Sequence, residues 1–385
     1  MIYLELLLIG VLLLVVIWHF RRGHKPAIWF DGPALRPEGL TAHGVELAKY
    51  HRIATNRPSF GLLLRRLRGN FLLVTQAYSA AAEDLRRGKD VAPAGEWLLD
   101  NYYVVEEQVR EILLHVRGRH FRRLPVLGNG QFRGLPRVYA IALELVAHTD
   151  GRLDQQVLVN FINAYQQERN LTIAEIWALS LMIKTALVEK IRDGCVLLRD
   201  THSNWRQAEE LVAKPQQLLE KIQAMKHLQP SMVEHLLELS RHENLDSQEI
   251  REALAERLAE KDTTPERLIQ AEHQAAAARA TSLGNAISSL KDVGALDWDE
   301  IFESLCPVGR VLAEDSTYRE MDFPSRNYYR SKVQALARRT RTSETRVAKL
   351  AMECAREGQG VENHCGYYLL DQGREALLRR LGKGV

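Results

Sequence analysis

Cysteine pairs, glycine-rich loops and basic clusters are scarce in this chain, and each scarcity removes a class of function. The 385 residues hold four cysteines, Cys195, Cys306, Cys354 and Cys365, which are far apart and form no CxxC pair. They predict reduced thiols and no metal site, because a structural zinc site usually needs ligands in close pairs. No phosphate-binding loop or nucleophile elbow stands out. With a net charge of +3 and no compact basic block, the chain indicates no nucleic-acid partner.

A long apolar run opens the chain. Residues 2–20 carry Glu5 as their one charge, and a basic cluster beginning at Arg21 follows directly. About 19 residues at ~1.5 Å rise each can cross a hydrocarbon core. A cleaved signal peptide would have its basic residues before the run. The sequence therefore predicts a single-pass transmembrane anchor over residues 1–24, and the positive-inside rule places the rest of the chain in the cytoplasm at the inner membrane.

Helical spacing of apolar residues recurs beyond the anchor. It predicts an all-α protein, with one N-terminal transmembrane helix followed by a multi-helix cytosolic bundle. An apolar stripe lies on residues 96–112, at Leu98, Tyr102, Val105, Val109 and Ile112. A second helix is expected from Pro136, and a third from a capping box at Thr172 and Glu175 as far as Arg192.

Polar side chains on these helices are candidates for a shared polar seam. They are Glu96, Asp100, Glu107, Glu144, His148, Asp150 and Glu175. Carboxylates crowded together between helices can serve general acid–base chemistry. The favoured interpretation is a structural network, with pairs such as Glu144 and His148 one helical turn apart. No residue is assigned as catalytic, and no cofactor is predicted in this chain.

Composition divides the chain into four predicted parts. These are the anchor at residues 1–24, a helical domain with the polar seam at 25–200, a variable polar helical insert at 201–275, and a C-terminal helical domain at 276–385. Prolines 215, 230 and 265 are expected to punctuate the helices of the insert. The stretch from Asp297 to Glu300 is similar to the Asp-x-Asp signature of sugar transferases, but its spacing favours a helix N-cap.

Several of these segments together resemble one enzyme family. WLLDNYYVVEEQVREI, GLPRVYAIALELVAHTDGRLD and LTIAEIWALSLMIKTALVEKI closely resemble the N-terminal region of bacterial cyclic β-1,2-glucan synthases. A second match runs from SLGNAISSLKDVGALDWDEIF through RNYYRSKVQALARRT to HCGYYLLDQGREAL. The resemblance covers residues 40–200 and 275–380 in the same order. It implies a role in building glucan from a nucleotide-activated glucose, in an enzyme that also trims the glucan by phosphorolysis and closes it into a ring.

The resemblance also implies what this chain lacks. The catalytic modules of such a synthase would lie past Val385, so the chain is expected to be a membrane-anchored scaffold whose partners are the inner membrane and a downstream glycosyltransferase module or chain. These synthases grow glucan on the protein itself, which makes Tyr367 and Tyr368 candidate acceptors, although no residue pattern selects them. The alternatives are a stand-alone helical adaptor at the inner membrane and a self-sufficient carboxylate-based glycosyl transferase or hydrolase.

Overall fold

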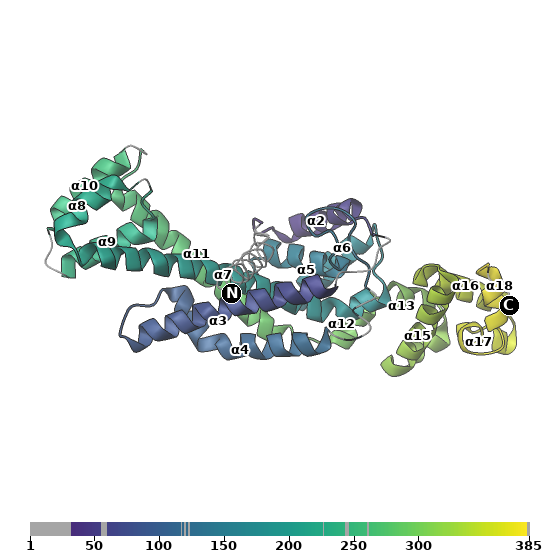
Figure 1. Ribbon diagram of the computed structural model, residues 1–385. Helices are drawn as coiled ribbons and strands as arrows, with labels where there is room; N and C mark the ends of the chain where they lie inside the picture. Colours follow the sequence, from purple (N-terminus) through teal and green to yellow (C-terminus); the bar gives the residue numbers. More distant parts are fainter. Residues whose placement is uncertain are drawn as a thin grey trace, which may run out of the picture.

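The structure is a computed structural model, and it describes the chain as helices joined by loops (Figure 1). The described residues are 32–54, 60–116, 118, 121, 124–225, 227–242, 246–259 and 262–382. Within these ranges no strand occurs, and two isolated β-bridges are the only β-pairing. The predicted all-α fold is confirmed for this part of the chain. The anchor predicted over residues 1–24 lies outside the described residues. None of the helices within them combines the length and apolarity needed to cross a bilayer.

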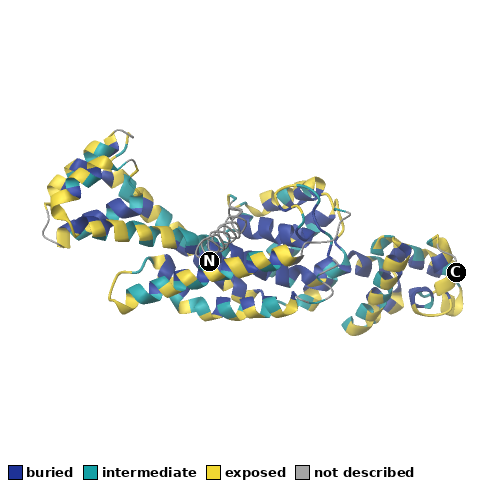
Figure 2. Ribbon diagram, in the orientation of Figure 1, coloured by how far each residue is buried: buried dark blue, intermediate teal, exposed yellow. Residues whose placement is uncertain are grey.

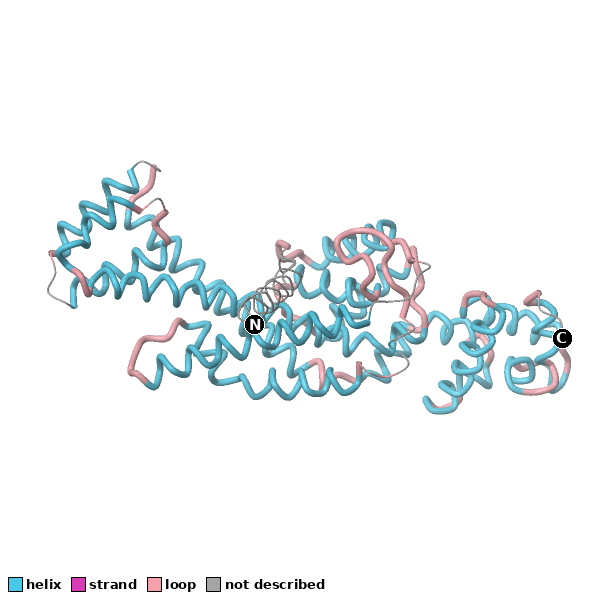
Figure 3. Tube along the Cα trace, viewed as in Figure 1, coloured by secondary structure: helices cyan, strands magenta, loops and turns pink. Residues whose placement is uncertain are grey.

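A ring of long helices forms the centre of the molecule. They are α3 (Phe60–Arg86), α4 (Pro93–His115), α7 (Ile173–Val212) and α11 (Pro265–Asp292). Helix α3 packs against α4, α4 against α11, α11 against α7, and α7 against α3. On the outside of this ring α5 (Arg137–His148) packs against α7, while α2 (Pro37–Tyr50) packs against α6 (Gln155–Gln166). Residues 124–136, which lead into α5, run beside the segment that follows α2, where Leu127 bridges to Ile53 (Figure 3).

Helix α4 is amphipathic in the way its sequence predicts. Leu98, Val105, Val109 and Ile112 are fully buried. The fifth member of the predicted stripe, Tyr102, is half-buried. Its ring stacks on that of another tyrosine in α3 at a centroid distance of 4.0 Å. Glu96, Asp100, Tyr103 and Glu107 are exposed, whereas the Glu111 carboxylate pairs with Lys184 of α7. One apolar face is therefore sufficient to hold α4 against α3 and α11.

Helix α5 is buried on every side, which makes its few polar side chains dependent on partners. Its residues from Arg137 to Ala147 are all buried (Figure 2). Arg137 forms a bidentate ion pair with Glu175, and the Tyr139 hydroxyl donates to Glu189. Such groups are costly to bury unless their charges and hydrogen-bonding atoms are matched. Glu175 and Glu189 both come from α7, so these two pairs set the register of α5 on α7.

Helix α7 begins as predicted but ends much later. The Thr172 hydroxyl and the Glu175 carboxylate form the predicted capping box. The predicted end at Arg192 is wrong, because α7 continues to Val212. Gly194 lies inside the helix, and a Cβ at this position would come 3.2 Å from Leu283 of α11. A glycine costs a helix only about 1 kcal/mol relative to alanine. Close packing against α11 outweighs that cost.

The far ends of α7 and α11 carry a second core. This end of the molecule, the tip, is completed by α8 (Pro215–Ala224), α9 (Pro230–His242) and α10 (Ser247–Ala259). Its core is separate from that of the central ring and is formed by residues such as Leu218, Leu236 and Leu254. Prolines 215, 230 and 265 are each the first residue of a helix, as their punctuating role predicts. The predicted boundary at residue 200 falls within α7.

A lobe of short helices occupies the end of the molecule opposite the tip (Figure 1). After α12 (Trp298–Leu305) come α13 (Pro307–Leu312), α14 (Ser316–Glu320), α15 (Phe323–Thr340), α16 (Glu344–Glu357), η2 (Gly360–Glu362), α17 (Cys365–Leu370) and α18 (Arg374–Arg380). The Asp297 carboxylate accepts from the backbone N–H groups of Asp299 and Glu300, which confirms the N-cap interpretation of this stretch. All four cysteines are buried and free, as predicted.

Candidate functional site

The predicted seam residues on α4 lie apart from the others. Glu96, Asp100 and Glu107 are exposed on the outer face of the helix. Carboxylates in this position are solvated and lie apart from the buried polar side chains between α5 and α7. The structure therefore does not bring them into a common seam with the remaining candidates.

Glu175 is buried in the junction of α5 and α7. Its carboxylate accepts from the backbone N–H of Thr172 at 2.9 Å and from Nε of Arg137 at 2.7 Å. Arg137 also donates to the carbonyl of Asn170. Although burial alone would lower it, the pKa of Arg137 is raised, because Glu175 stabilises the charged guanidinium. Both carboxylate oxygens of Glu175 therefore accept hydrogen bonds that hold α5 and the start of α7 together.

Asp150 lies just past the end of α5, in the turn toward α6. Its backbone is left-handed, with φ 51°. Its carboxylate accepts from the Ser282 hydroxyl at 2.6 Å and lies 3.1 Å from Nζ of Lys190. Ser282 belongs to α11 and Lys190 to α7. Asp150 therefore ties the turn to two helices of the central ring.

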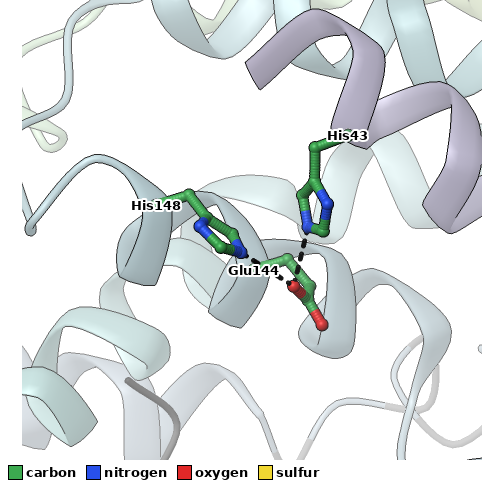
Figure 4. Close-up of side chains that lie close together, drawn as sticks. All are labelled: His43, Glu144 and His148. Atoms are coloured by element: carbon green, nitrogen blue, oxygen red, sulfur yellow. Dashed lines mark hydrogen bonds and ion pairs between the residues drawn. The ribbon is translucent and has the colours of Figure 1, made fainter. Parts of the chain in front are cut away.

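Glu144 and His148 are the two predicted candidates that the structure brings together, and His43 of α2 joins them (Figure 4). Nε2 of His43 is 2.9 Å from Oε2 of Glu144, and Nε2 of His148 is 3.6 Å from the same oxygen. The two imidazole rings meet edge to face with centroids 4.3 Å apart. The three side chains are 28%, 12% and 13% exposed for His43, Glu144 and His148. They form a small polar cluster that is open to solvent on one side.

The packing of α2 explains why His43 reaches this position. Leu40, Gly44 and Leu47 are the buried face of the helix, and His43 lies beside them, three residues after Leu40. Gly44 packs closely on α6, since a Cβ there would lie 3.1 Å from the Phe161 carbonyl oxygen. Sequence reasoning missed His43 because it lies 101 residues before Glu144. Its place on the apolar face of α2 is the one signal that points inward.

The backbone before α2 orients the ring of His148. The Pro33 carbonyl oxygen lies 2.9 Å from Nδ1 of His148. Gly32 makes this approach feasible, because a Cβ at position 32 would come 2.5 Å from Cε1 of the ring. A carbonyl oxygen can only accept, so Nδ1 carries a proton and Nε2 is the atom turned toward Glu144.

A second histidine–carboxylate cluster lies in the C-terminal lobe. Nδ1 of His364 is 2.6 Å from Oδ2 of Asp315, and its Nε2 is 3.0 Å from the Tyr329 hydroxyl. The backbone N–H of Cys365 also donates to Asp315. Burial raises the pKa values of the Tyr329 hydroxyl and the Cys365 thiol, so both groups are held in their neutral forms.

The candidate acceptor tyrosines lie close to this second cluster in the chain. Tyr368 is buried in the lobe, and Tyr367 is half-buried beside it, with the two rings edge to face at 5.2 Å. Burial raises the pKa of each hydroxyl. The nearby Glu362 carboxylate adds to this rise in pKa at both residues. Their acceptor role remains a prediction.

A pocket that the sequence analysis did not single out lies between α7 and α15. It has a volume of ≈ 330 Å³, and its lining includes Trp177, Asn327, Arg330 and Gln334. Trp177 is 48% exposed even though its ring packs against Phe302. The sequence signal that could have located this pocket is the large indole of Trp177 among the apolar residues at the start of α7.

Comparison with known proteins finds a long sequence match but no family model that matches the chain. Among the described residues the fold is a helical bundle with an added tip and lobe. The chain is 30% identical over 335 residues to the cyclic beta-(1,2)-glucan synthase NdvB of Rhizobium meliloti (strain 1021). The match takes in 82% of this chain and 12% of that protein. The predicted resemblance to part of such a synthase is confirmed, and the chain spans only a small share of its relative.

Proposed function

We propose that this chain is a membrane-anchored helical scaffold in cyclic β-(1,2)-glucan synthesis. In this role it docks and orients a glucosyltransferase module that lies outside these 385 residues and uses a nucleotide-activated glucose. The observation that carries the proposal is the match to a cyclic beta-(1,2)-glucan synthase over 82% of the chain at 30% identity.

The arrangement of polar groups supports a scaffold over a self-sufficient enzyme. Acid–base catalysis needs groups that can converge on one substrate atom. In this chain the Glu175 carboxylate is bonded to Arg137 and caps the start of α7, and the Asp150 carboxylate is bonded to Ser282 and paired with Lys190. Glu96 faces solvent elsewhere, on α4. The buried ion pairs instead hold long helices in register, which is what a docking platform requires.

The membrane anchor is proposed from the sequence alone. Residues 2–20 are apolar, and basic residues follow them. An anchor of this kind would keep the helical body at the surface where a membrane-bound transferase meets its cytosolic donor. Fractionation of cells that express the full chain, or a version starting at residue 25, tests this part. The full chain should sediment with membranes and resist salt extraction, whereas the shortened version should not.

Replacement of the matching region in NdvB tests the scaffold role. Membranes carrying a synthase without that region should form no cyclic glucan from labelled nucleotide-glucose, and insertion of this chain should restore it. A replacement carrying Gly194→Trp is the matched negative control, because Leu283 leaves no room for a large side chain there. Full glucan production without the region would contradict the proposal. Sustained glucose incorporation by the purified chain alone would favour the self-sufficient enzyme instead.

A further inference from the structure

We propose that His43, Glu144 and His148 bind one divalent transition-metal ion of the Zn²⁺ class, which joins α2 to α5. The donor set is two imidazole nitrogens and one carboxylate oxygen, a combination suited to Zn²⁺. This inference goes beyond the role in glucan synthesis and does not depend on it. It concerns the residues of this chain and can be tested without any sugar chemistry.

The spacing of the donor atoms fits a single ion. Zn²⁺ binds histidine nitrogen and carboxylate oxygen at about 2.0–2.2 Å, so tetrahedral ligand atoms lie about 3.4 Å apart. The carboxylate oxygen of Glu144 lies 2.9 Å from Nε2 of His43 and 3.6 Å from Nε2 of His148. All three donor atoms lie within 4.8 Å of one another. Small side-chain rotations would place them around one ion without moving either helix.

The orientation of the His148 ring places its second nitrogen in the cluster. Nδ1 lies 2.9 Å from the Pro33 carbonyl oxygen, which can only accept a hydrogen bond. Nε2 is therefore the ring nitrogen on the side of Glu144, 3.6 Å from its Oε2. A bound ion would be coordinated by this nitrogen, by Nε2 of His43 and by the Glu144 carboxylate.

The contacts around His148 are those of a metal ligand. Histidines that bind metal almost always donate the other ring N–H to a carbonyl or carboxylate, which fixes the ring. Here the partner is the Pro33 carbonyl, and Gly32 allows the backbone to come that close. Glu144 and His148 lie one turn apart on a helix that is otherwise buried, so two of the three ligands are held in position before an ion binds.

Three protein ligands leave a fourth coordination position. Of the three side chains His43 is the most exposed, at 28%, so the site opens to solvent beside α2. Zn²⁺ sites with three protein ligands carry a water molecule or a small ligand at this position. The ion would thus fasten α2 to α5 and remain accessible from outside.

Metal binding by the full chain, purified in mild detergent without a polyhistidine tag, tests the proposal. After chelator treatment and desalting, the protein is titrated with Zn²⁺ in competition with a chromophoric chelator, and Co²⁺ is added separately for its visible absorption. The wild-type chain should bind one Zn²⁺ and give the intense bands of four-coordinate Co²⁺. Glu144→Gln and His43→Asn should each weaken binding by more than ~100-fold, beyond the loss typical of an outer partner.

Matched variants separate this site from other histidines. Gly32→Ala, which leaves all three ligands in place, should weaken binding about 10-fold by displacing the His148 ring. His273→Asn should leave binding unchanged, because His273 pairs with Glu234 at 2.5 Å and is not part of the cluster. Circular dichroism of each metal-free variant confirms that it folds. Sub-stoichiometric binding by the wild type, equal binding by Glu144→Gln, or binding of Mg²⁺ in preference to Zn²⁺ would each overturn the proposal.

Discussion

The two histidine–carboxylate clusters use the same residue types in opposite ways. In the C-terminal lobe both ring nitrogens of His364 have partners, the Asp315 carboxylate and the Tyr329 hydroxyl. Between α2 and α5, Nδ1 of His148 bonds to the Pro33 carbonyl, while its Nε2 and Nε2 of His43 both lie beside one oxygen of Glu144. The first arrangement is a chain of hydrogen bonds that stabilises the lobe. The second gathers two imidazole nitrogens and a carboxylate oxygen within 4.8 Å of one another.

The carboxylates of the two clusters differ in the same sense. Asp315 caps α14 by accepting from the backbone of Thr317 and Tyr318, and it also accepts from Cys365. Although its partial burial raises the pKa of Asp315, these hydrogen bonds and His364 lower it below the ordinary value. Glu144 has contacts to the two imidazoles. Stability should therefore depend on Asp315, and ligand binding on Glu144.

The largest effect is expected from Asp315→Ala. The change removes a helix cap and two further hydrogen bonds to a charged group, so the free energy of unfolding should fall by about 3 kcal/mol. Asp297→Ala is the matched control, since Asp297 caps α12 through the same type of contact to two backbone N–H groups. It should cost about 1 kcal/mol. Urea unfolding of both variants measures the difference, and equal losses would remove the distinction between the clusters.

Zn²⁺ should stabilise the chain by an amount that depends on Glu144 and not on His364. At a free Zn²⁺ concentration 100 times the dissociation constant, one site contributes about 2.7 kcal/mol to the free energy of unfolding. His364→Asn should keep this gain and Glu144→Gln should lose it. Thermal unfolding with and without Zn²⁺ measures both. Loss of the gain in His364→Asn alone would place the metal in the lobe.

Another histidine, His51, should make the fold sensitive to acid. Its Nδ1 lies 3.0 Å from the Tyr165 hydroxyl, and burial, followed by the charges of Arg137 and Arg169, lowers its pKa to about 4. Between pH 6.5 and 4 the unfolded chain binds a proton at this residue and the folded chain does not. Stability from this residue is therefore complete above about pH 6.5 and is lost as the pH falls.

Comparison of the wild type with His51→Asn isolates this effect. After allowance for solvent screening, the wild type should lose about 2 kcal/mol more than the variant between pH 7 and pH 4.5. Urea midpoints at the two pH values provide the measurement. Parallel losses in the two proteins would show that His51 takes up its proton in the folded state as readily as in the unfolded one.

The smallest effects should have opposite signs at two neighbouring tyrosines. Tyr329→Phe removes the hydrogen bond to His364 and should cost about 1 kcal/mol. The buried Tyr318 hydroxyl has no hydrogen-bond partner among the described residues. Tyr318→Phe should therefore leave stability unchanged or raise it slightly, because a buried hydroxyl without a partner is costly. Equal losses from both changes, measured by urea unfolding, would contradict this account.

Local signals in the sequence predict the helix starts well. The capping box at Thr172, the cap at Asp297 and the prolines at 215, 230 and 265 all begin helices as expected. Each signal acts on backbone groups within one turn, so neighbouring residues suffice to read it. The end of α7 could not be predicted from neighbouring residues, because Gly194 lies in the middle of the helix and packs against Leu283 of a distant helix.

The candidate site was predictable only to the extent that it is local. Glu144 and His148 share a helical face, and their pairing follows from that spacing. His43 comes from 101 residues away, and the role of Glu175 is decided by Arg137, 38 residues before it. Side chains on separate helices meet only after the helices pack, and no spacing rule describes that step. The convergence expected for the carboxylates of α4 failed for the same reason.

Helix α7 links the distant parts of the molecule mechanically. It contributes to the core of the central ring near its start and to the core of the tip near its end. Forty residues at ~1.5 Å each make a rod about 60 Å long. A tilt of the whole rod by about 5° shifts one end relative to the other by roughly 5 Å. A rearrangement around Arg137 and Glu175 that tilts the rod would therefore also move the tip.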